Sequence, residues 1–133
     1  MGPPRDRAGA ADGGIDVAPP FGEGHTEIAQ ALLTAGADKE ANNNNGWTAL
    51  MLASHYGQTE TVQALLAAGT DKDAKSKKGY TALMLSSIKG DTEIAQMLLA
   101  AGVDKEIKNI DGYTALNLAI YYGHTDIVAM LTA

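Results

Sequence analysis

Residues Gly79–Asp111 read GYTALMLSSIKGDTEIAQMLLAAGVDKEIKNID, and this stretch decides the fold. The 33 residues before it, Gly46–Lys78, read GWTALMLASHYGQTETVQALLAAGTDKDAKSKK and are identical to it at more than half of their positions. The same spacing continues after it with GYTALNLAIYYGHTDIVAMLTA at Gly112–Ala133, and before it with GHTEIAQALLTAGADKEANNNN at Gly24–Asn45. A strict period of this length predicts an array of stacked repeats, because one such unit cannot bury its apolar face alone.

Each period is predicted to hold two short helices joined by a tight turn. Thr48 can cap the start of a helix over 49–56, and Gly57 can end it in the left-handed conformation. A second helix is predicted to open at Thr59 and to end at Gly69, with apolar residues at i, i+3 and i+4. The polar residues that follow must connect to the next unit. Helices this short are marginal alone, so an all-α solenoid stabilised by stacking is expected.

Leucines at equivalent positions of successive repeats are expected to form the core. The predicted rows are Leu50, Leu83 and Leu116; Leu65, Leu98 and Leu131; and Leu66 with Leu99.

The chain divides into a leader and a repeat domain. The leader, residues 1–21, contains all four prolines, and Pro19 and Pro20 stand where the first helix of a first repeat would lie. We expect this segment to be irregular or disordered. It is either an unrelated sequence joined to a truncated repeat or a diverged N-terminal cap. The repeat domain, 22–133, is predicted to comprise a partial repeat over 22–45, repeats over 46–78 and 79–111, and a truncated repeat over 112–133.

Composition argues against several function classes. The net charge of −6 disfavours nucleic-acid binding, which depends on neutralising phosphates, and no apolar run approaches the length of a membrane span. There is no cysteine, no nucleophile beside a base in a distinctive motif and no phosphate-binding loop. We therefore expect an intracellular, cytoplasmic protein that is not an enzyme and has no catalytic residue, cofactor or metal site.

The histidines do not suggest a metal site either. His25 and His124 are equivalent positions three repeats apart, so stacked helices would hold them roughly 25 to 30 Å from one another. His55 has no second histidine nearby in the predicted array. A structural role is expected for His25 and His124. The recurring pairs Asp38–Lys39, Asp71–Lys72 and Asp104–Lys105 likewise indicate a structural role in the connections.

The recurring pattern G-x-T-A-L, then G-x-T-E, then L-L-x-x-G-x-D resembles the ankyrin repeat, over about Gly24–Ala133. The common family opening T-P-L-H is TALM at Thr48–Met51 and Thr81–Met84 and TALN at Thr114–Asn117, so proline and histidine are missing from each copy. Alanine can start a helix as proline does. Met51 and Met84, however, cannot make the hydrogen bond of the family histidine, which concerns the rigidity of the turns and not the fold.

The resemblance also implies where a partner would bind. Ankyrin proteins bind other proteins through turn tips and the inward surface of the first helices, and these positions differ most between the repeats of this chain. The implied surface comprises Asn44, Asn45, Trp47, Lys77, Lys78, Tyr80, Ile110, Asp111 and Tyr113 at the tips, with His55, Tyr56, Ile88, Lys89, Tyr121 and Tyr122 at the helix ends.

Aromatic residues are concentrated on this predicted surface and could anchor a partner. Alternatively, Trp47, Tyr80 and Tyr113 pack on neighbouring turns, and the helix-end tyrosines are partly buried beside the short helices. The run Lys75, Lys77 and Lys78 is open to two interpretations as well. It hints at a nuclear signal or an acidic partner, but flanking aspartates favour a solvated loop.

The function expected from these features is protein–protein interaction. The alternative is a structural array without a dedicated partner, from a truncated reading frame or an engineered scaffold. In the final unit, the apolar residues Ile127, Val128, Met130 and Leu131 have no following repeat to cover them. The sequence is thus either a fragment of a longer array or a chain that associates weakly end to end through this helix.

Overall fold

The computed structural model of the protein describes Glu40 and residues 42–133. The predicted leader, His25, and the helix of the partial repeat lie outside the described residues. So does the Asp38–Lys39 pair. The predictions made for these parts of the chain therefore remain predictions.

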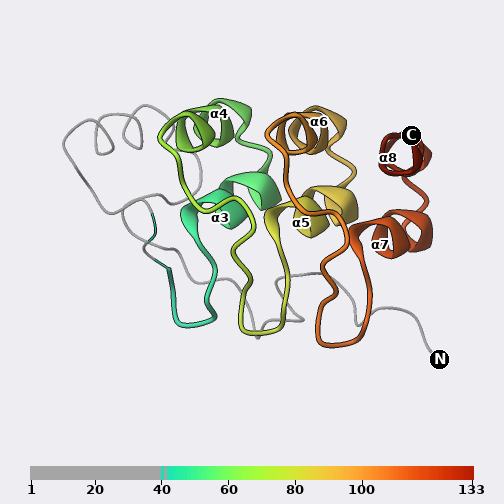
Figure 1. Ribbon diagram of the computed structural model, residues 1–133, viewed down its shortest axis with the longest axis horizontal. Coiled ribbons are helices and arrows are strands. Elements are labelled where there is room, and N and C mark those ends of the chain that lie inside the picture. Colours follow the sequence, from blue (N-terminus) through green and yellow to red (C-terminus); the bar gives the residue numbers. More distant parts are fainter. Residues whose placement is uncertain (1–39, 41) are drawn as a thin grey trace.

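Three helix pairs follow one another along the described chain. They are α3 (Ala49–Tyr56) with α4 (Thr59–Ala67), α5 (Ala82–Lys89) with α6 (Thr92–Ala100), and α7 (Ala115–Tyr121) with α8 (Thr125–Thr132). Figure 1 shows the first helices of the pairs in one row and the second helices in a row above them, with long hairpin loops projecting below. The predicted all-α array of stacked helix–turn–helix units is confirmed.

The predicted helix starts are confirmed in detail. The Oγ1 atoms of Thr48, Thr81 and Thr114 each accept a hydrogen bond from the backbone N–H three residues ahead, at 3.2 to 3.3 Å. In the last pair, the Asn117 side chain also accepts the N–H of Thr114 at 3.0 Å, which completes a capping box. The TALN variant thus provides a bond at this position that Met51 and Met84 cannot make.

Burial follows from the two-layer arrangement. The first helices lie inside the array, and all residues from Ala82 to Ile88 of α5 are buried. The second helices bury one face only, so the row Leu65, Leu98 and Leu131 is buried whereas Leu66 and Leu99 are half-buried. In the remaining row, Leu50 and Leu83 are buried, but Leu116 is half-buried because no described helix covers the far side of α7.

The prediction for the last helix needs a correction. Ile127 and Leu131 of α8 are buried against the rest of the array, and Val128 and Met130 are half-buried. The exposed apolar residue at this end is instead Ile120 of α7, with 58% of its surface accessible. Its equivalents in the earlier repeats are the fully buried Ser54 and Ser87, which the next helix pair covers.

Candidate protein-binding surface

The hairpin tips are shaped by local side-chain hydrogen bonds. The Asn43 Oδ1 atom accepts the N–H groups of Asn45 and Trp47, each at 3.0 Å. Asn109 does the same for Asp111 and Tyr113. Asparagine favours such turns because its side-chain oxygen can substitute for a backbone acceptor.

Backbone hydrogen bonds tie each tip to the next one. The Lys77 N–H donates to the Asn45 carbonyl at 3.0 Å, and the Ile110 N–H donates to the Lys78 carbonyl at 3.1 Å. The three described tips therefore form one continuous edge with a fixed spacing between neighbouring hairpins. We call residues 42–46, 75–79 and 108–112 the tip edge.

Carboxylates tie the bases of the hairpins together. The Glu40 carboxylate accepts the Asp71 N–H at 3.0 and 3.2 Å and the Thr70 hydroxyl at 3.1 Å. One repeat later, Asp73 accepts the Asp104 N–H at 2.8 Å. In the predicted pairs themselves, the Asp71 and Asp104 carboxylates accept backbone N–H groups two residues ahead at 3.1 and 2.9 Å, and the Lys105 ammonium donates to the Leu131 carbonyl at 3.3 Å. These contacts fit the structural role predicted for the pairs.

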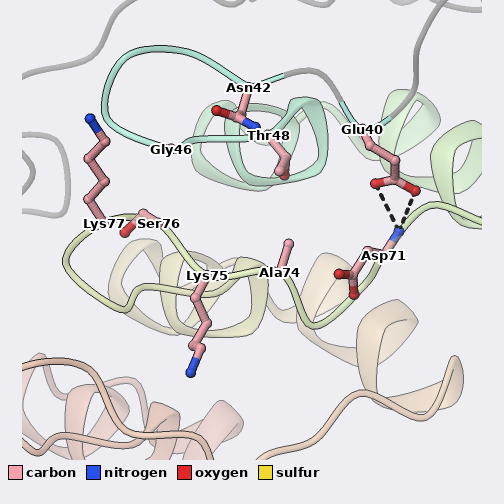
Figure 2. A pocket seen from close by; sticks show the side chains of 9 residues that line it. All are labelled: Glu40, Asn42, Gly46, Thr48, Asp71, Ala74, Lys75, Ser76 and Lys77. Carbon is pink, nitrogen blue, oxygen red and sulfur yellow. Dashed lines mark hydrogen bonds between the residues drawn. The ribbon is translucent and has the colours of Figure 1, made fainter.

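A groove of about 670 Å³ lies between the first two hairpins. Figure 2 shows the Glu40–Asp71 contact at one end of the groove and Lys77 toward the other end. Ala74 and Lys75 lie between them, on the segment that runs from Asp71 to Lys77. Because the carboxylate end is occupied by its own backbone contacts, the tip end is the part available for new polar contacts.

Three residues predicted on the surface are buried instead. Trp47, Tyr80 and Ile88 are at most 6% exposed and belong to the hydrophobic core. The prediction that they present exposed side chains is wrong. The burial of Trp47 and Tyr80 agrees with the alternative that these rings pack on neighbouring turns, whereas Tyr113 at the same position is half-buried.

The other predicted residues keep at least partial exposure. Ile110 is 64% exposed, Tyr121 50% and Tyr56 36%. The other exposed residues are Asn44, Lys77, Lys78, Lys89 and Asp111, and the half-buried ones are Asn45, His55, Tyr113 and Tyr122. Fewer aromatic side chains are therefore exposed on this surface than the sequence predicts, and Tyr56 and Tyr121 are the most exposed of them.

Ring contacts connect the tips to the ends of the first helices. The Trp47 and His55 rings lie 5.5 Å apart, and the His55 and Tyr56 rings lie 4.8 Å apart, both edge to face. In the last pair, Tyr121 and Tyr122 make a similar contact at 4.9 Å. Each exposed tyrosine thus makes an edge-to-face contact with a neighbouring half-buried ring, an arrangement that aromatic pairs favour.

A shallow hollow of about 420 Å³ lies between the ends of α3 and α5. His55, Tyr56, Lys89 and Asp91 line it. The Asp91 carboxylate is already occupied as the N-cap of α6, where it accepts the Ile94 N–H at 3.1 Å. The hollow thus contains the Tyr56 ring, the Lys89 cation, the Asp91 carboxylate and the His55 imidazole.

Burial and the nearby Lys89 charge lower the pKa of His55 from 6.5 to about 4. Its Nδ1 atom is buried and has no hydrogen-bond partner among the described residues. The imidazole is therefore uncharged at neutral pH, which suits its contacts with the Trp47 and Tyr56 rings.

His55 is expected to make folding stability pH-dependent. The unfolded chain takes up a proton on this residue near pH 6.5, but the folded chain does so only near pH 4, so stability is lost as the pH falls through this window. Replacing His55 by Asn should reduce that loss by about 1 to 3 kcal/mol, after allowance for partial solvent screening. Urea titrations of both proteins at several pH values measure it; equal losses of stability would contradict the assignment.

Sequence reasoning missed two lysines of the surface. Lys75 and Lys108 are exposed and stand 33 residues apart, at the first position of the second and third described tips. The signal was present, since both differ from the equivalent Asn42, but Lys75 was interpreted as part of a solvated loop.

Other kinds of site find no support in the described residues. No group of three or more His, Cys, Asp or Glu side chains in that part of the chain is placed to hold a metal ion. None of the helices described is both long and apolar enough to cross a membrane.

Comparison with known proteins is informative at the level of the family. The family model for ankyrin repeats (3 copies) matches residues 21–109 and 60–133. No curated protein matches the chain closely enough to identify a relative. Ankyrin repeats are generally non-enzymatic modules of protein–protein interaction. The period, the stacked helix pairs and the family match together show that the chain belongs to the ankyrin repeat family.

Proposed function

We propose that this protein is a non-enzymatic interaction module that binds another protein through the tip edge and the exposed ends of the first helices. The observation that carries the proposal is the exposure of Tyr56 and Tyr121, each in edge-to-face contact with a neighbouring ring, in an array whose tips are hydrogen-bonded to one another. Aromatic anchors on a preorganised surface provide much of the affinity in protein interfaces.

The exposed aromatic residues are also hard to explain by stability. Within the described part of the chain, the core is formed by other residues, and Tyr56 remains 36% exposed although α5 packs beside its helix. A structural array without a dedicated partner has no need of tyrosine at such a position. This contrast favours binding over the purely structural alternative.

Truncating an anchor tyrosine should weaken binding without unfolding the protein. Binders can be selected with the full chain from a displayed library of natural protein segments. Tyr56→Ala or Tyr121→Ala is expected to reduce their affinity at least tenfold, because each removes a large exposed contact. Gln96→Ala, on the exposed face of α6, is the matched control and should leave affinity unchanged. Isothermal titration measures affinity, and circular dichroism verifies the fold.

Two results would speak against the proposal. One is a selection from which no specific binder emerges, which would favour the structural alternative. The other is a set of binders that tolerate both tyrosine substitutions but lose affinity with Gln96→Ala, which would place the interface on the second helices.

We also propose weak self-association, through the far side of α7 and not through the last helix. The buried positions of Ile127 and Leu131 remove them as contacts, whereas Ile120 and the half-buried Leu116 present apolar surface on the far side of α7. Exposed apolar area of this kind favours association.

A further inference from the structure

The tip edge differs in charge from the rest of the molecule. Its four lysines, Lys75, Lys77, Lys78 and Lys108, are all exposed, and Asp111 is the one acidic residue in the three described tip segments. The whole chain, in contrast, has a net charge of −6. A local excess of positive charge in an acidic protein creates an attractive surface for negatively charged groups.

Four carboxylates near these lysines in sequence are engaged in hydrogen bonds at the hairpin bases. Glu40 and Asp73 lie at the hairpin bases, where they accept backbone N–H groups of the following repeat. Asp71 and Asp104 accept N–H groups within their own turns. These four carboxylates are thus engaged at the hairpin bases, whereas Glu106 and Asp111 are exposed close to Lys108 in the sequence.

The backbone bonds between hairpins fix the spacing of the main-chain segments that carry these lysines. Lys77 and Lys78 both lie in peptide units that pair with the neighbouring tips, through the Asn45 carbonyl and the Ile110 N–H. A binding segment would therefore meet Lys77 and Lys78 at the middle tip and Lys108 at the next one. Ile110, between Lys108 and Asp111, adds exposed apolar surface on the same edge.

We propose that the tip edge binds an acidic segment of the partner protein, with Asp or Glu side chains facing Lys77 and Lys78 and an apolar side chain against Ile110. This inference rests on the proposed function and specifies the chemistry of the partner. Complementary charge raises the association rate and selects among partners, and the apolar contact adds affinity that salt does not screen.

Nucleic acid also carries negative charge, but the surface fits it less well. Binding a phosphate backbone depends on neutralising many phosphates, and the described tips offer four lysines with one aspartate among them. The apolar Ile110 has no role in a contact with phosphates. An acidic protein segment uses both features.

The test is to select random displayed peptides with the full chain and to compare two double variants. Lys77→Glu with Lys78→Glu reverses two charges on the tip edge. Lys72→Glu with Lys105→Glu reverses two charges at the hairpin bases and changes the net charge equally. We expect the selected peptides to be enriched in Asp and Glu. Their affinity should fall at least tenfold for the Lys77→Glu/Lys78→Glu protein (the tip variant) but less than threefold for the Lys72→Glu/Lys105→Glu protein (the base variant). A higher salt concentration should also weaken the binding of these peptides to the unmodified chain.

The outcomes separate this inference from the proposed function. Peptides that depend on Tyr121 but are neutral or basic, or that bind the tip variant normally, overturn the acidic-segment inference and leave the proposed function intact. Absence of any specific peptide overturns both. Binding of a DNA duplex by the unmodified chain, with no enrichment of acidic peptides, also overturns the inference. Thermal unfolding of both variants verifies that each remains folded.

Discussion

Leu98→Ala is expected to lower the free energy of unfolding by about 2 to 5 kcal/mol. Leu98 is completely buried in α6, which contacts the second helices on both sides, α4 and α8. Removing its side chain leaves a cavity that the flanking helices cannot easily close. Urea denaturation followed by circular dichroism gives the difference in unfolding free energy.

The adjacent Leu99 provides a matched control on the same helix. Its side chain is half-buried, so Leu99→Ala removes the same atoms but leaves much less of a cavity. We expect Leu99→Ala to be clearly less destabilising than Leu98→Ala. Equal effects of the two substitutions would contradict the assignment of Leu98 to the core and Leu99 to its margin.

Gly79→Ala is expected to destabilise the protein by about 3 kcal/mol or more, of which about 1 to 2 comes from the left-handed backbone. Gly79 has φ of +81°, and a Cβ atom there would lie 2.8 Å from the Cα of Asn109 and 3.1 Å from the N of Ile110. These are backbone atoms of the next hairpin and cannot simply rotate away. The hydrogen bond between the Lys78 carbonyl and the Ile110 N–H would be strained or lost.

Gly112 isolates the steric part of this effect. It has almost the same φ, +85°, but a Cβ atom at this position would have nothing within 4 Å. Gly112→Ala should therefore show only the backbone penalty, and the difference between the two variants measures the close approach of the hairpins. Thermal and urea unfolding provide the comparison; a Gly112→Ala variant as unstable as Gly79→Ala would show that the approach of the hairpins contributes nothing.

Much of the fold could be predicted from the sequence because local chemistry and the period agree. Thr48, Thr81 and Thr114 cap the first helices as expected, and Gly57 and Gly90 end two of them in the left-handed conformation. The buried row Leu65, Leu98 and Leu131 follows from apolar periodicity. Each of these features depends on a few neighbouring residues, so the sequence contains the relevant information.

The surface was harder to predict because variation between repeats does not specify the direction of a side chain. Trp47 and Tyr80 occupy a variable position, yet their rings turn inward, and Trp47 packs on the His55 ring. Ile88 is buried where the equivalent Tyr121 is half exposed, since α7 has no described helix beyond it. Contacts between repeats, such as that of Glu40 with Asp71, join residues about one period apart. They could not be predicted from local sequence.

The central claim, that the tip edge and first-helix ends form the binding surface, is tested most directly by amide hydrogen exchange. A selected protein segment is added to the full chain, and exchange is compared with that of the free protein. We expect additional protection at residues 75–79, at 108–113 and around Tyr56 and Tyr121, with α4, α6 and α8 unchanged. Protection confined to the second helices, with the tips exchanging as in the free protein, would contradict the claim.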